Sequence, residues 1–207
     1  MRMKVVNLAM ALLLSAAAQP VLAQGNVSDG HAFVKAVRDR DGNKVGEMLR
    51  ARPGVVNARD DKGETGLMAA ISQRDQDFTA YLLSQGADPS LVARNGDTAL
   101  IKAARIGYAD AAHYLLDLRA PVDASNRMGE TALIVAVQQR QAAVVKLLLA
   151  AGANPDKTDN AAGLSAREYA KRDTRSREIL ALIEGATKKP PAKTFVPPKD
   201  AADFTIK

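Results

Sequence analysis

The feature that most constrains the fold of this chain is an internal repeat of 33 residues. Six positions recur at that interval through three consecutive units. They are Gly63, Gly96 and Gly129; Thr65, Thr98 and Thr131; Leu67, Leu100 and Leu133; Ala70, Ala103 and Ala136; Leu82, Leu115 and Leu148; and Ala87, Ala120 and Ala153. A short unit that repeats in this way cannot bury its own apolar face alone, so neighbouring units must stack. The spacing therefore predicts a repeat solenoid.

Each unit carries two amphipathic segments. In the first, Leu67, Ala70 and Ile71 stand at i, i+3 and i+4, which is one apolar stripe of a short helix. The alanines keep this stripe thin, so that neighbouring helices can approach closely. The second segment, from Phe78 to Leu82 in the first unit, repeats the pattern with bulkier side chains. The sequence therefore predicts a helix–turn–helix unit.

Capping residues mark the helix ends. A threonine precedes the first helix of each unit, where its hydroxyl can accept hydrogen bonds from free N–H groups. Gly86 and Gly152 follow the second helix, where a C-terminal cap favours positive φ. Arg119 takes this place in the middle unit, so either it is strained or that helix ends differently. The glycine that opens each unit favours a hairpin-like turn.

These residues resemble the ankyrin-repeat family: a hairpin turn, a Thr-x-Leu helix start, paired alanines, Leu-Leu in the outer helix, and Gly-Ala at the end. The resemblance covers residues 31–185 and implies an all-α repeat solenoid. Asp60 matches the turn-stabilising Asp of the family; Asn126 can replace it, whereas Ala93 cannot.

Two positions depart from the family pattern. The proline after the threonine is replaced by Gly66, Ala99 and Ala132. The histidine at the helix start is replaced by Met68, Ile101 and Ile134. Loss of this histidine removes a hydrogen-bond tie, so we expect stability to depend more on apolar contact.

The resemblance and the composition divide the chain into segments. They are a cleavable signal peptide (1–23), a short linker (24–30), an N-terminal capping repeat (31–58), three full repeats (60–92, 93–125 and 126–158), a C-terminal capping repeat (159–185) and a Pro/Lys-rich flexible tail (186–207).

The N-terminal segment has the pattern of a signal peptide. Arg2 and Lys4 precede an apolar run, and small or short side chains precede Gln24, so we expect cleavage after Ala23. The run is shorter than the roughly 20 residues that span a membrane, which disfavours an uncleaved anchor. We expect export to the bacterial periplasm, with secretion as the alternative, and no transmembrane span after cleavage.

The basic charge is unevenly distributed. The whole chain carries a formal net charge of +6, but residues 24–185 contain 22 Lys plus Arg and 21 Asp plus Glu. The near-neutral repeats argue against a nucleic-acid groove, and export argues against nucleic acid as well. Binding of the lysine-rich tail to an anionic membrane or envelope surface remains an alternative function.

Catalytic and cofactor signals are weak. The chain has no cysteine, no tryptophan and two histidines, and it has no Gly-rich phosphate loop, His-Glu-x-x-His or Gly-x-Ser-x-Gly motif. We therefore expect no catalytic residue, no cofactor and no metal, and hence a non-enzymatic protein; an enzyme or metal protein with an unfamiliar site is the alternative.

The resemblance implies that hairpin tips and first helices line a concave face that binds another protein. On this chain the implied residues are Asp61, Lys62, Glu64, Met68, Arg94, Asn95, Asp97, Ile101, Arg105, Arg127, Met128, Glu130, Ile134 and Gln138. An apolar row of Met68, Ile101 and Ile134 with a charged rim suits a protein interface. The alternative is that this row packs beneath the tips of adjacent repeats. We expect a monomer with a protein partner.

Overall fold

The computed structural model describes residues 27–186, and within them ten α-helices and one 3-10 helix. The elements are α1 (Val27–Arg38), α2 (Gly42–Ala51), η1 (Pro53–Asn57), α3 (Gly66–Ser72), α4 (Gln76–Ser84), α5 (Ala99–Ile106), α6 (Ala109–Asp117), α7 (Ala132–Gln138), α8 (Ala142–Ala150), α9 (Ala166–Arg172) and α10 (Arg177–Ala186). The expected signal peptide and residues 187–207 of the expected tail lie outside the described residues.

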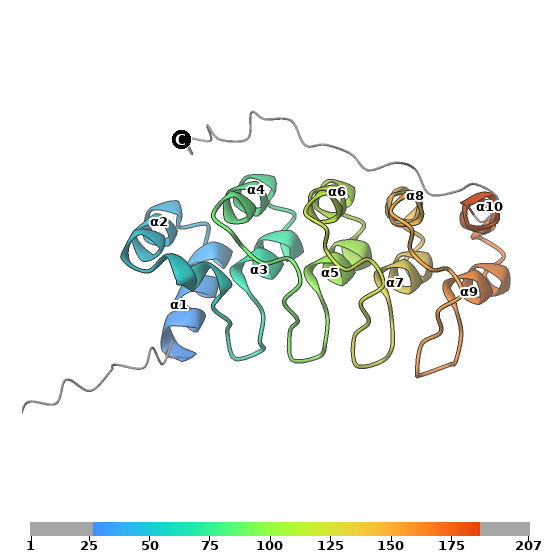
Figure 1. Cartoon of the computed structure of the whole chain (residues 1–207), viewed down its shortest axis with the longest axis horizontal. Helices are drawn as coiled ribbons and strands as arrows, with labels where there is room; N and C mark the ends of the chain where they lie inside the picture. The colour runs from blue at the N-terminus through green and yellow to red at the C-terminus, as the bar shows by residue number, and fades with distance from the viewer. Residues whose placement is uncertain (1–26, 187–207) are drawn as a thin grey trace, which may run out of the picture.

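The helices form five pairs that stack side by side. Figure 1 shows an inner row of α1, α3, α5, α7 and α9 and an outer row of α2, α4, α6, α8 and α10. Long loops project from the inner row on the side away from the outer helices. Each inner helix packs against its outer partner and against the inner helices of neighbouring units. The predicted all-α solenoid is confirmed.

The N-terminal boundary differs from the prediction. Residues 24–30 were expected to form a linker, but α1 begins at Val27. Gly30 is buried here, and a Cβ at this position would lie 2.1 Å from the carbonyl oxygen of Arg59. The glycine therefore permits close packing of a helix, although its sequence context is typical of a linker. At the other end, α10 extends to Ala186.

The repeating apolar positions form the core. The six repeating leucines are at most 1% exposed, and the repeating alanines Ala70, Ala103 and Ala136 are fully buried. The six leucines are Leu67, Leu82, Leu100, Leu115, Leu133 and Leu148. The small alanine side chains let the inner helices approach one another, and the leucines fill the space between the inner and outer rows. The core is therefore continuous along the stack, as expected for a solenoid.

Hydroxyl caps begin the inner helices α3, α5, α7 and α9, and the three threonine caps were predicted. Thr65 Oγ1 accepts from the N–H of Met68 at 3.3 Å, and Thr98 and Thr131 make the equivalent contacts at 3.1 and 3.2 Å. In the last unit Ser165 forms a reciprocal capping box with Glu168.

Left-handed residues follow the outer helices α4, α6 and α8. Gly86 and Gly152 have φ of 83° and 87°, and Arg119 takes the same conformation with φ of 59°. The middle helix therefore ends like its neighbours, with a strained non-glycine residue at the cap.

Three further arginines adopt positive φ at the turn between inner and outer helices, at Arg40, Arg74 and Arg140. Each contacts the following unit. Arg40 Nε lies 2.6 Å from Asp75 Oδ2, and Arg140 Nε lies 2.6 Å from Asp173 Oδ2. Arg74 Nη2 donates to the carbonyl of Gly107 at 2.8 Å. These side chains join adjacent repeats, and the sequence pattern did not indicate this role.

Candidate protein-binding surface

The hairpin tips form one continuous row because their backbones bond to one another. The N–H of Arg94 donates to the carbonyl of Lys62 at 2.9 Å, and that of Arg127 donates to Asn95 at 3.1 Å. The N–H of Asn160 continues the series with the carbonyl of Met128 at 2.8 Å. We call Asp61, Lys62, Arg94, Asn95, Arg127 and Met128 the tip row. Because the backbones are linked, the tips hold a fixed spacing.

Side chains also fix the conformation within each hairpin. Asp60 Oδ1 accepts from the N–H groups of Lys62 and Glu64, both at 2.9 Å. Burial raises the pKa of Asp60, but the Glu64 N–H, the Arg38 guanidinium and the Lys62 N–H outweigh it, so the pKa lies below its usual value.

The other hairpins use different side chains for the same purpose. Asn126 Oδ1 accepts from the N–H groups of Met128 and Glu130, both at 3.0 Å, as the sequence predicted. In the repeat that begins at Ala93, Asn95 Oδ1 accepts from the N–H of Asp97 at 3.0 Å instead.

The inner end of the first hairpin is bound by charged groups from the two neighbouring units. Arg38 Nη2 lies 2.8 Å from Asp60 Oδ2 and 2.7 Å from Glu64 Oε2. Lys102 Nζ contacts the other oxygen of Glu64 at 2.6 Å. These groups are partly or fully buried, so they stabilise the stack and leave little charge for a partner.

A second network follows in the next two repeats. Arg105 Nη2 lies 3.3 Å from Asp97 Oδ1 and 3.9 Å from Glu130 Oε2. Asn126 Nδ2 donates to Asp97 Oδ1 at 3.0 Å and to Glu130 Oε2 at 2.8 Å. Both carboxylates are buried beneath the tips. Their charges therefore hold repeats together.

The structure divides the residues that were expected to bind a partner. Asp61, Lys62, Arg94, Asn95, Arg105, Arg127 and Met128 are exposed, and Glu64 and Gln138 are partly buried. Met68, Asp97, Ile101, Glu130 and Ile134 are buried and have no surface for a partner. That part of the prediction is wrong: the apolar row packs inside the stack, at 1%, 0% and 0% exposure. A row at 33-residue spacing is consistent with either location, so sequence alone did not decide it.

The tip row carries cations whose charge is not used within the stack. Lys62, Arg94 and Arg127 are exposed, and their side chains make no ion pair within the described residues. The carboxylate of Asp61 lies 3.6 Å from His31 Nδ1. Met128, at 53% exposure, is among the most exposed large apolar side chains of the described part. Three cations without an ion pair in the described part, and one thioether, all on a fixed frame, can recognise an acidic protein surface.

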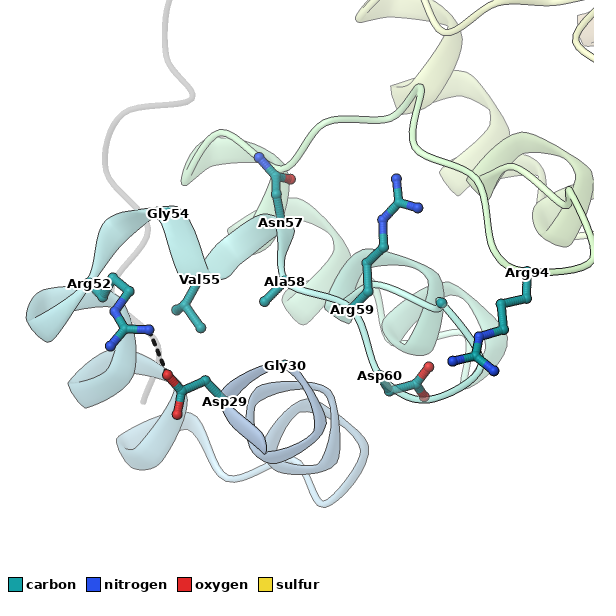
Figure 2. Close-up of a pocket in the computed structure, with 11 residues that line it drawn as sticks. Asp29, Gly30, Arg52, Gly54, Val55, Asn57, Ala58, Arg59, Asp60 and Arg94 are labelled. Atoms are coloured by element: carbon teal, nitrogen blue, oxygen red, sulfur yellow. Dashed lines mark hydrogen bonds and ion pairs between the residues drawn. The ribbon is translucent and has the colours of Figure 1, made fainter. Parts of the chain in front are cut away.

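A cavity of about 530 Å³ adjoins the N-terminal end of this row. It lies between the start of α1, η1 and the first two hairpins (Figure 2). Arg52 and Asp29 form an ion pair of 2.6 Å at one end, and Arg94 lies at the other end with its side chain directed toward Asp60 (Figure 2). Sequence reasoning missed this cavity because its walls come from distant segments, at Gly30 and Arg94 for example.

The described residues contain no group of three or more His, Cys, Asp or Glu side chains placed to hold a metal ion. Among residues 27–186 no helix is both long and apolar enough to cross a membrane.

Comparison with known proteins identifies the family. The family model for ankyrin repeats, in three copies, matches residues 33–125 and 67–159. The chain therefore belongs to the ankyrin-repeat family, whose repeats generally mediate protein–protein interaction. It is also similar to the human 2-5A-dependent ribonuclease, with 36% identity over 81 residues. The match covers 39% of this chain but 11% of the relative, so the chain spans about a tenth of the length of that protein.

Proposed function

We propose that the chain is a non-enzymatic binding module that is exported to the bacterial envelope and recognises a partner protein through its tip row. The observation that carries the proposal is the row of Lys62, Arg94 and Arg127, exposed and without ion pairs in the described part. The acidic side chains beneath them are already paired with Arg38, Lys102 and Arg105.

The chemistry of the row suits a protein interface. Arginine and methionine are enriched at such interfaces, and binding energy concentrates in a few side chains. The backbone bonds between hairpins fix these side chains before a partner arrives, which lowers the entropy lost on binding. The exposed side chain of Arg105 and the half-buried Gln138 lie on inner helices and contribute a polar rim.

Export is argued from the pattern of residues 1–23. A fusion of the full chain to a reporter that folds only outside the cytoplasm tests it. The expected result is an active reporter with the native leader and an inactive one when Arg2 and Lys4 are both replaced by Glu. Equal activity of the two fusions would contradict export through this segment.

Partner binding is tested by crosslinking. A tagged full-length chain, produced in its native host, is crosslinked and its captured proteins are identified. The proposal expects one specific envelope protein, whose capture falls when Arg94 and Arg127 are both changed to Glu. The matched control is Lys146→Glu on the exposed side of α8, far from the tips in Figure 1. Capture that the tip-row variant leaves unchanged would contradict the proposal.

The alternative function, attachment of the lysine-rich tail to an anionic surface, makes a different prediction. Vesicles rich in phosphatidylglycerol should then bind the chain, and replacement of Lys188, Lys189 and Lys193 by Gln should abolish this binding. The tip-row variant would bind such vesicles normally.

A further inference from the structure

The cavity beside the tip row has the size and the walls of a side-chain pocket. Its volume of about 530 Å³ falls within the roughly 300–1,000 Å³ of typical ligand clefts. Val55 and Ala58 give it apolar lining, and Gly54 and Gly63 also border it. One or two side chains of an extended partner segment have room there.

The ion pairs around the cavity determine which charge it accepts. The carboxylate of Asp29 is neutralised by Arg52 at 2.6 Å. That of Asp60 is neutralised by Arg38 at 2.8 Å and also accepts two backbone N–H groups. Neither carboxylate has charge left for a ligand.

The unpaired charge at the cavity is cationic. Arg94 lines the cavity, and its guanidinium has no ion pair within the described residues. Arg59 also lines the cavity. Hydrogen bonds from Ser90, and to a smaller extent the charge of Arg59, lower the pKa of Asp88. A guanidinium beside an apolar wall favours a carboxylate with a short aliphatic stem, because the fork of donors matches two oxygens.

Arg94 belongs both to the cavity and to the tip row. A segment bound along the tips can therefore place a side chain in the cavity beside Arg94. We propose that the cavity is the specificity pocket for an acidic side chain, Glu or Asp, in an extended segment of the partner protein. This inference rests on the proposed function and deepens it, since it names the chemistry of the partner.

The test uses a fluorescein-labelled peptide in which Glu alternates with Ser, and a counterpart with Gln in place of every Glu. Fluorescence anisotropy measures the binding of each to the purified full-length chain. The Glu peptide should bind at least about tenfold more tightly than the Gln peptide, and added salt should weaken it. Equal binding of the two peptides would overturn the proposal.

Two variants separate the pocket from general charge. Ala58→Glu places a carboxylate in the cavity, and Arg94→Gln removes its free cation; each should weaken binding of the Glu peptide about tenfold. Arg127→Gln removes the same charge from a tip outside the cavity and should weaken binding by less than about threefold. Far-UV circular dichroism and thermal unfolding check that each variant is folded. If Ala58→Glu does not fold, the comparison of Arg94→Gln with Arg127→Gln alone decides between the pocket and general charge.

The outcomes distinguish this inference from the function on which it rests. Equal losses from Arg94→Gln and Arg127→Gln, with none from a folded Ala58→Glu, would show recognition by charge along the tips. The proposed role of the cavity as a specificity pocket would then be wrong, and the proposed protein-binding function would remain. By contrast, partner capture that is unchanged when Arg94 and Arg127 are both replaced by Glu would contradict the proposed function itself.

Discussion

Lys102 Nζ lies 2.6 Å from Glu64 Oε1, so an inner helix of one repeat holds the hairpin of the repeat before it. The second oxygen of Glu64 lies 2.7 Å from Arg38, in the N-terminal capping repeat. One carboxylate therefore links three consecutive units. The sequence suggested that apolar contact would replace the lost histidine tie, and the structure adds this charged tie.

Replacement of Glu64 by Gln should destabilise the stack. Both cations would lose their charged partner in a site where Glu64 is only 18% exposed and Lys102 15%. Charge-assisted bonds of this kind contribute about 1.5–3 kcal/mol. Urea unfolding followed by circular dichroism measures the change. Glu47→Gln, at an exposed site on α2, is the control and should stay within about 0.5 kcal/mol. Equal stability of the two variants would show that the link contributes nothing.

The buried leucines of the core should not tolerate truncation of their side chains. Leu115 on α6 is fully buried between the inner and outer rows. Leu115→Ala should lower the free energy of unfolding by about 2–5 kcal/mol, because it removes apolar contact and leaves a cavity. Leu118 follows the same helix and is 51% exposed, so Leu118→Ala should change stability little. Similar losses for both would contradict the described packing of α6.

The left-handed cap at Arg119 should be improved by glycine. A non-glycine residue at φ of 59° costs about 1–2 kcal/mol, of which glycine recovers part after its own entropic cost. Arg119→Gly should therefore raise stability by about 0.5–1 kcal/mol in thermal unfolding.

Arg140→Gly is the informative comparison. It relieves the same strain but removes the 2.6 Å pair with Asp173, so its gain should be smaller or negative. An equal gain would mean that this pair does not stabilise the turn.

Ionisation of the Asp173 carboxyl should make the free energy of unfolding depend on pH in the acid range. The Arg140 guanidinium, the N–H of Arg175 and the hydroxyl of Ser176 hold the pKa of Asp173 well below its usual value. The folded pKa lies below the unfolded value of about 3.9, so the group stabilises the fold above that pH. The contribution is lost as the pH falls toward the folded pKa.

Asp173→Asn tests this link. Wild type should exceed the variant in unfolding free energy at neutral pH, and the gap should shrink as the pH falls below about 4. A gap that does not vary between neutral and acid pH would exclude an ionised Asp173 as its cause.

Much of the fold could be predicted from the sequence because the repeat places the same residue in the same environment each time. The threonine caps and the glycines after the outer helices follow from local geometry, and the turn roles of Asp60 and Asn126 were implied by the family resemblance. Such contacts involve residues a few positions apart, so a repeating local pattern indicates them.

The surface could be predicted less well, because it depends on contacts between repeats. Whether Met68 faces a partner or the core depends on how the neighbouring units pack around it. The links from Arg38 to Glu64 and from Arg140 to Asp173 join residues 26 and 33 positions apart. The cavity at Arg94 needs four segments in place at once, and no local pattern marks it.

The central claim is that the tip row binds an envelope protein, and the most direct measurement is the affinity of the captured partner for tip-row variants. Surface plasmon resonance with the immobilised partner would compare wild type, Arg94→Glu/Arg127→Glu and the control Lys146→Glu. We predict that the tip-row variant binds at least about tenfold more weakly and that the control binds like wild type. Equal affinity of all three folded chains would contradict the account.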